Sequence, residues 1–229
     1  MADIRTHTVE FPANGETGHG FLAIPDGDGP FPGVIVVQEW WGLDNHIKDV
    51  AGRFATEGFV SLAPDLYHGK VTSEPDDAQK LMMSLNMPQA VRELEKAAEY
   101  LASRPEIGAR GIGAIGFCMG GGLALTLACA SPHVKAVAPF YGVNPTPIDK
   151  VRNLSGPVLA VYAENDNFAG EAVRRQLESA LRDAGIQREI QVYPGTEHAF
   201  FNDTRPEVHN REAAEDAWKR ALALFRENL

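Results

Sequence analysis

The sequence predicts an α/β protein in which a mostly parallel sheet of about eight strands is flanked by helices. Three observations indicate this class. Strand and helix patterns alternate along most of the 229 residues, which favours crossover connections between parallel strands. The run 33–39 (GVIVVQE) is almost entirely apolar, as expected for a strand covered on both faces. The segment 111–122 concentrates glycines at a predicted strand-to-helix junction.

The individual elements follow from local patterns. Residues 5–11 and 19–25 are predicted to form an opening pair of strands, because Asn-Gly and Asp-Gly turn signals bound them. In the segment 88–104 apolar residues recur at helical spacing. No repeat or linker is found, so a single domain over residues 1–229 is predicted, with the Pro-rich 142–150 as a loop on it. The remaining strands are expected at 33–39, 59–65, 111–116, 134–140, 157–163 and 188–193, and the remaining helices at 46–57, 78–85, 119–130, 170–184 and 209–227.

Composition excludes several classes of function. A net charge of −10 argues against nucleic acid or an anionic membrane as partner, because both require a basic surface. Apolar runs are too short for a bilayer span, and no secretory signal pattern is found, so a cytoplasmic protein is expected. The histidines are scattered and the two cysteines form no metal-type spacing, so no metal or other cofactor is expected. A monomer is expected, with a homodimer as the alternative.

The glycine-rich segment has two competing interpretations. Gly111 to Gly116 match a G-x-G-x-x-G dinucleotide loop, but that loop must follow a strand, whereas these residues lie along a predicted strand. Gly116 and Gly120 also flank Cys118 as in a nucleophile elbow, where the turn is too tight for larger neighbours. The following helix N-terminus would stabilise a thiolate. We therefore favour the elbow. A structural cysteine is the alternative, and it is the role we expect for Cys129.

Candidate partners for Cys118 follow in the order that such a site requires, namely nucleophile, acid and histidine. The strand 157–163 is followed by Glu164 and Asp166, and the strand 188–193 by a turn that carries His198. Asp166 is preferred as the acid, with Glu164 as the alternative. Glu39 ends the strand expected beside the elbow, so its carboxylate can hold the thiol protonated or accept its proton.

At these motifs the sequence resembles the dienelactone hydrolase family of the α/β-hydrolase fold, also called carboxymethylenebutenolidases. The resemblance runs nearly end to end and implies no lid domain. It implies that Cys118 is the nucleophile, His198 the base and Asp166 its orienting partner. It further implies that Glu39 contacts the resting cysteine and that the backbone N–H groups of Trp40 and Met119 form the oxyanion hole. The matching segments are VVQEWWGL (36–43), LAPDLYHG (62–69), GAIGFCMGGGLAL (113–125), PFYG (139–142), AENDNF (163–168) and YPGTEHAF (193–200).

The resemblance implies hydrolysis of a small ester or lactone through an acyl-cysteine. Archetypal members hold a substrate carboxylate with two arginines. This chain has Asn202 at one of the two positions, and residues 66–80, where the other is expected, contain no arginine but two lysines, Lys70 and Lys80. A more neutral ester or lactone is therefore expected. A thioesterase, a short-chain carboxylesterase and a non-catalytic ligand-binding or redox-sensing protein are the alternatives. The candidate pocket residues are Trp41, Tyr141, Phe200 and Asn202. Phe201 also suits an apolar pocket wall, and core packing is the alternative for one of the two phenylalanines, as ordinary packing is for Trp41.

Overall fold

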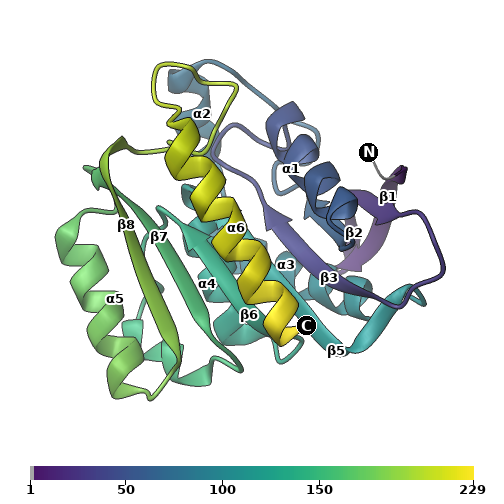
Figure 1. The fold of residues 1–229 in the computed structure, drawn as a ribbon. Helices are drawn as coiled ribbons and strands as arrows, with labels where there is room; N and C mark the ends of the chain where they lie inside the picture. Colours follow the sequence, from purple (N-terminus) through teal and green to yellow (C-terminus); the bar gives the residue numbers. More distant parts are fainter. Residues whose placement is uncertain (1–2) are drawn as a thin grey trace.

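The computed structural model describes residues 3–229 and, within them, every side chain but that of Arg110. It contains one eight-stranded sheet in the order β1-β2-β4-β3-β5-β6-β7-β8 (Figure 1). β2 pairs antiparallel with β1 and β4, and all the other neighbours are parallel. The strands are β1 (Ile4–Ala13), β2 (Glu16–Pro25), β3 (Phe31–Val37), β4 (Val60–Pro64), β5 (Ile107–Phe117), β6 (Val134–Phe140), β7 (Val158–Asn165) and β8 (Arg188–Glu197).

Helices cover both faces of the sheet. Helices α1 (Asn45–Thr56) and α6 (Arg211–Asn228) pack on one face. Helices α3 (Met87–Ala102), α4 (Met119–Ala130) and α5 (Glu171–Asp183) pack on the other. In Figure 1, α3 and α4 lie behind the sheet, and α5 is at its left edge. The shorter α2 (Pro75–Ser84) follows β4. This arrangement confirms the predicted α/β class with a mostly parallel sheet.

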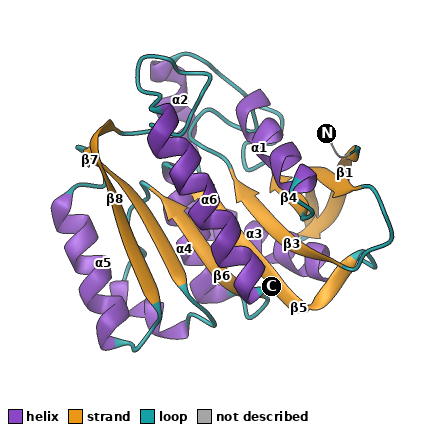
Figure 2. Ribbon diagram, in the orientation of Figure 1, coloured by secondary structure: helices purple, strands orange, loops and turns teal. Residues whose placement is uncertain are grey.

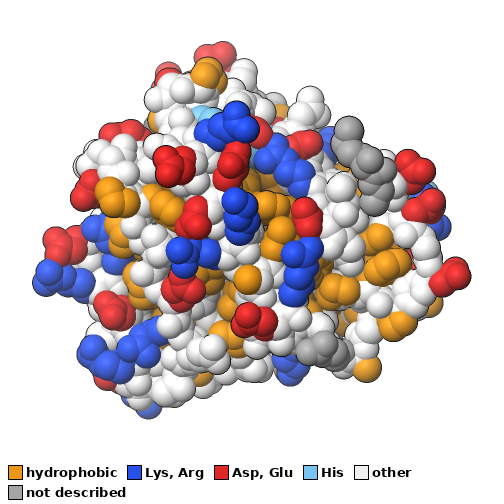
Figure 3. Space-filling model, viewed as in Figure 1, with side chains coloured by type: hydrophobic (Ala, Val, Ile, Leu, Met, Phe, Trp, Pro, Cys, Tyr) orange, Lys and Arg blue, Asp and Glu red, His pale blue; other side chains and the backbone are white. Residues whose placement is uncertain are grey.

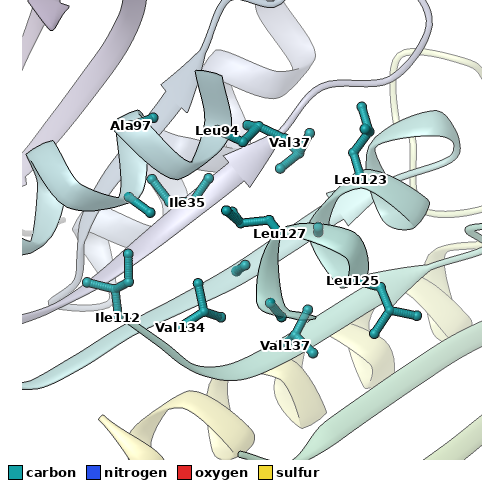
Figure 4. Close-up of a cluster of buried hydrophobic side chains, with 14 of the residues drawn as sticks. Ile35, Val37, Leu94, Ala97, Ile112, Leu123, Leu125, Leu127, Val134 and Val137 are labelled. Carbon is teal, nitrogen blue, oxygen red and sulfur yellow. The ribbon is translucent and has the colours of Figure 1, made fainter. Parts of the chain in front are cut away.

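The central strand β3 contributes to two hydrophobic cores. Ile35 and Val37 belong to the core beneath α3 and α4, and Val34 and Val36 to the core beneath α1 and α6. Successive side chains of a strand point to opposite faces, so a continuous apolar run is what a strand covered on both sides requires. Figure 4 shows Leu127 of α4 beside the β3 side chains. Since α4 is buried on nearly all sides, its N-terminus is held firmly against the sheet.

Most predicted elements are confirmed, and the differences have physical causes. β1 and β2 are longer than predicted because ten residues on each pair across a two-residue turn. Asn14 and Gly15 in that turn both have positive φ, as tight hairpins require. The predicted loop 142–150 continues into a 3₁₀ helix, Ile148–Asn153. This helix forms because its residue Val151 is fully buried and joins the core.

The loops that follow β3, β7 and β8 gather at one end of the sheet, because these strands run parallel (Figure 2). On the face viewed in Figure 3, acidic and basic side chains are interspersed over α6. Several of them form ion pairs, among them Arg211 with Glu215 and Arg220 with Asp216. Within residues 3–229 no helix combines the length and apolarity that a membrane span needs.

Candidate active site

Cys118 occupies a sharp turn between β5 and α4. Its backbone has φ 57° and ψ −120°, a conformation that costs free energy for any residue other than glycine. Its N–H donates a hydrogen bond of 3.1 Å to the carbonyl oxygen of Phe140, which ties the turn to the end of β6. The side chain is half-buried at the N-terminus of α4. A strained turn that presents a thiol at a helix N-terminus is suited to a nucleophile.

The flanking glycines are required by close backbone packing. A Cβ atom at Gly116 would overlap the carbonyl oxygen of Gly120, and one at Gly120 would overlap the carbonyl oxygens of Val37 and Gln38. Gly116 and the glycines before it lie within β5. The glycine run therefore allows the elbow to sit against the end of β3, and the dinucleotide-loop interpretation lacks the strand–loop–helix arrangement that it needs.

His198 and Asp166 form a close pair after β8 and β7. His198 Nδ1 lies 2.8 Å from Asp166 Oδ2. Asp166 Oδ1 accepts hydrogen bonds from the N–H groups of Phe168 (2.7 Å) and Ala169 (2.9 Å). Burial acts to raise the pKa of Asp166, but His198 and these backbone donors outweigh it and hold the pKa below its ordinary value. The Asp166 carboxyl therefore favours its ionised form beside the imidazole of His198.

Glu164, the alternative acid, has a different environment. It is exposed, and its Oε2 accepts a hydrogen bond of 2.8 Å from the N–H of Gly195. Its carboxylate therefore supports the turn after β8, while the carboxylate that pairs with His198 belongs to Asp166.

The other nitrogen of His198 faces the elbow. Nε2 is buried and has no hydrogen-bond partner among the described residues. Burial by itself lowers the pKa of His198, but Asp166 and the nearby Cys118 thiolate outweigh it and raise the pKa to about 10. Next to an ionised Cys118, the imidazolium form of His198 is thus the favoured one.

Glu39 lies two residues beyond β3 and is buried. Its Oε2 accepts a hydrogen bond of 2.7 Å from Asn202 Nδ2. Its Oε1 has no hydrogen-bond partner within residues 3–229, Cys118 included. Burial raises the pKa of Glu39 to about 7, although the Asn202 hydrogen bond opposes the rise. Glu39 can therefore change its protonation state near neutral pH.

Two of the predicted pocket residues, Phe200 and Asn202, have almost no exposed surface. The Phe200 ring packs between Tyr141 and Tyr193, at centroid distances of 5.7 and 5.2 Å, so it forms part of the core. Asn202 holds Glu39 and accepts hydrogen bonds from Thr204. Both side chains therefore act behind the site.

The other two pocket candidates are also buried, and Tyr141 lies next to His198. Tyr141 is buried with φ 39°, and its ring centroid is 5.0 Å from that of His198. Trp41 is buried and packs edge-on against Trp40 at 5.0 Å. The Arg205 guanidinium lies over the Trp41 ring, 5.3 Å from its centroid.

Sequence reasoning did not identify two other residues near the site. Tyr67 donates a hydrogen bond of 3.5 Å from its hydroxyl to Met119 Sδ, and burial, with a contribution from the Cys118 thiolate, raises its pKa to about 12. Phe168 is 71% exposed, and its ring lies 5.3 Å from His198. Both residues fall within motifs of the family resemblance, but their environments depend on contacts between separate loops.

Replacing Glu39 by Gln is expected to change how stability depends on pH. Because the folded-state pKa of Glu39 is raised from 4.5 to about 7, folding favours its protonated form. The free energy of unfolding should therefore fall by roughly 3 kcal/mol in all as the pH rises from 4.5 to about 7. Glu39→Gln removes this loss. Urea unfolding between pH 4 and 8 should show equal stability near pH 4 and a more stable variant above pH 7.

The matched control is Glu178→Gln on the exposed side of α5, which should leave the pH curve unchanged. Parallel curves for the parent protein and Glu39→Gln would contradict the raised pKa of Glu39.

The sheet order, the elbow after β5 and the loops after β7 and β8 define the α/β-hydrolase fold. Solved structures agree. A provisionally assigned dienelactone hydrolase from Klebsiella pneumoniae superposes with a TM-score of 0.89 at 32% identity, covering 98% of this chain and 99% of that one. A dienelactone hydrolase-like promiscuous phosphotriesterase from metagenomic libraries superposes with a TM-score of 0.91 at 22% identity, covering 100% and 99%, which supports the fold alone.

Sequence comparisons identify the family. The model of the dienelactone hydrolase family matches residues 19–229. A relative from Aquifex aeolicus with the provisional name carboxymethylenebutenolidase is 33% identical, over 95% of this chain and 96% of its own. The protein usf of Aquifex pyrophilus is 37% identical, over 96% of this chain and 98% of its own. The chain belongs to the dienelactone hydrolase family and is a hydrolase that acts on esters or lactones.

Proposed function

We propose that this hydrolase uses Cys118 as its nucleophile, His198 as its acid and base, and Asp166 to orient the histidine. The observation that carries the proposal is the His198–Asp166 pair at 2.8 Å, next to a cysteine in a strained elbow. A nucleophile, a base within reach and a third group that fixes the base are the parts that covalent acyl transfer needs.

The reaction proceeds in two halves. The Cys118 thiolate forms a bond to the substrate carbonyl carbon, the carbon–oxygen bond to the leaving group breaks, and protonated His198 gives its proton to the leaving alkoxide. The product of this half is an acyl-cysteine thioester and an alcohol. Neutral His198 then takes a proton from water as the water oxygen attacks the thioester. The carboxylic acid leaves, and the thiolate and the imidazolium are restored.

The role of stabilising the oxyanion of the reaction is assigned to the backbone N–H groups of Met119 and Trp40, which would form the oxyanion hole. The N–H of Cys118 is already bonded to Phe140, so the next donor along the chain is that of Met119, in the first turn of α4. N–H groups in a first helical turn lack partners within the helix. The packing of Gly120 against the carbonyls of Val37 and Gln38 keeps the segment that leads to Trp40 beside the elbow.

Glu39 is assigned to control the protonation of Cys118. Where Cys118 is a thiol in the free enzyme, a carboxylate with a pKa of about 7 can accept its proton at neutral pH and so form the thiolate with which the first half begins. Its free Oε1 is the atom that would accept the proton. Asn202 positions the carboxylate through the other oxygen.

The substrate class that fits is a small, neutral ester or lactone. Arg205, which lies over the Trp41 ring, already pairs with Glu207, and Lys80 of α2 pairs with Asp77. Asn202 is engaged with Glu39. The exposed Phe168 ring beside His198 adds an apolar surface where the leaving group would lie. Apolar burial therefore contributes more to recognition than pairing with a substrate carboxylate.

The test is a panel of p-nitrophenyl acetate, butyrate and hexanoate alongside a dienelactone and its methyl ester, assayed with and without reductant. We expect kcat/KM for the neutral esters to exceed that for the anionic dienelactone by about tenfold or more, since Arg205 is already paired with Glu207 and a desolvated carboxylate without a cation partner is costly. Intact-mass measurement during turnover should find the acyl group on Cys118.

A strong preference for the anionic lactone would overturn the assigned substrate class while leaving the mechanism in place. Alkylation of Cys118 without release of product from any ester would contradict catalysis itself, and would favour a binding or redox-sensing role.

A further inference from the structure

Phe168 presents an exposed aromatic ring beside the proposed base. It belongs to the loop between β7 and α5 and is 71% exposed. Among the exposed large apolar side chains of the described residues it is the one aromatic ring. Its centroid lies 5.3 Å from that of the His198 ring, in an edge-on arrangement. Because covering apolar surface is favourable, a ligand that packs on this ring gains binding energy next to the reacting groups.

The backbone of Phe168 and the imidazole of His198 share one anchor. The N–H of Phe168 donates a hydrogen bond of 2.7 Å to Asp166 Oδ1. The other oxygen of that carboxylate, Oδ2, lies 2.8 Å from His198 Nδ1. The residue that carries the exposed ring is therefore held by the same side chain that orients the base.

A molecule that reaches His198 from solvent passes beside the Phe168 ring. The Tyr141 ring, 5.0 Å from that of His198, is almost fully buried, so it closes the part of the imidazole against which it packs. The His198 side chain keeps 19% of its surface exposed. In the proposed mechanism His198 gives its proton to the leaving alkoxide, whose oxygen must come within hydrogen-bond reach of the imidazole. The alcohol part of the ester therefore lies where it can pack on Phe168.

The charges around His198 favour a neutral alcohol part. Burial lowers the pKa of His198, and the groups that raise it are Asp166 and the Cys118 thiolate, both negatively charged. An alcohol part with its own carboxylate or phosphate would be repelled by this pair, whereas a neutral ring would not. An aromatic ring also gains from edge-on or offset stacking on phenylalanine, in addition to the area that it buries.

We propose that Phe168 selects esters of neutral aromatic alcohols, such as benzyl esters, by stacking with the ring of the alcohol part. This inference rests on the proposed Cys118–His198–Asp166 mechanism and adds to it the substrate class on the leaving-group side. The acyl part stays on Cys118 when the alcohol leaves and does not pack on Phe168. Phe168 therefore determines specificity for the alcohol and leaves the length of the acyl chain free.

The experiment compares benzyl acetate with methyl acetate by following acid release in a pH-stat. Both esters give the same acetyl-cysteine, and their alcohols are of similar acidity, so a difference in kcat/KM reports recognition of the alcohol part. We expect kcat/KM for benzyl acetate to be higher by about tenfold or more. Phe168→Ala should lower it by about tenfold for benzyl acetate and by less than about twofold for methyl acetate. Phe168→Tyr keeps the ring and should retain the preference to within about twofold.

The matched control is Val71→Ala in the loop after β4, where another apolar side chain is exposed, and the benzyl preference should stay within about twofold of the parent. Methyl hexanoate tests the acyl side, and Phe168→Ala should change its kcat/KM by less than about twofold. Equal kcat/KM for the two acetates, an unchanged benzyl preference in Phe168→Ala, or a loss in that variant shared by methyl acetate or methyl hexanoate would overturn the role of Phe168 and leave the proposed function in place. No hydrolysis of any of these esters by the parent protein would contradict the proposed function and this inference together.

Discussion

Cys118→Ala is expected to reduce ester hydrolysis by at least about 10⁴-fold in kcat/KM, because in the proposed mechanism the acyl intermediate forms on Cys118. The fold should be unaffected, since the side chain is only half-buried and alanine tolerates the same turn no worse than cysteine does. Initial rates with p-nitrophenyl acetate measure the loss, and circular dichroism with thermal unfolding verifies the fold.

Cys129→Ala is the matched control for this variant. Cys129 is buried near the C-terminal end of the same helix, α4, and burial raises the pKa of its thiol to about 12. It should therefore resist alkylation, and its replacement should leave activity in place. If Cys118→Ala kept more than a tenth of the parent activity while Cys129→Ala lost activity, Cys118 could not be the nucleophile.

Asp166→Asn is expected to lower kcat by about 10³- to 10⁴-fold with a much smaller change in KM. An amide at this position loses the charge that favours the imidazolium form of His198, and its NH₂ group can hold the imidazole in the wrong tautomer. The pH–rate profile should shift as well, because Asp166 is one of the two groups that raise the pKa of His198. Stopped-assay kinetics across pH 5 to 9 measure both effects.

Glu164→Gln separates the two acids that the sequence offered. Its carboxylate accepts only the Gly195 N–H, a bond that the glutamine oxygen can retain, so kcat should change by less than about threefold. A large loss in Glu164→Gln together with near-normal activity in Asp166→Asn would reverse the assignment of the orienting acid.

Local sequence patterns were sufficient to predict most of the fold. The apolar run 33–39 and the glycine-flanked Cys118 each impose a structure on a few consecutive residues, because backbone conformation and burial there depend on nearest neighbours. The buried 3₁₀ turn at Ile148–Asn153 was missed because its formation depends on burial of Val151 in the core.

By itself, the sequence determined the fold class, the elbow at Cys118 and the strand ends that carry Asp166 and His198. The preference for Asp166 over Glu164 came from the sequence, but only the tertiary structure showed its carboxylate beside His198. Only the tertiary structure paired Glu39 with Asn202 across 163 positions and placed Phe200 in the core. The physical reason is distance along the chain. A turn or a strand is determined by residues next to one another, whereas a hydrogen-bond partner or a raised pKa depends on which distant loops meet and exclude water.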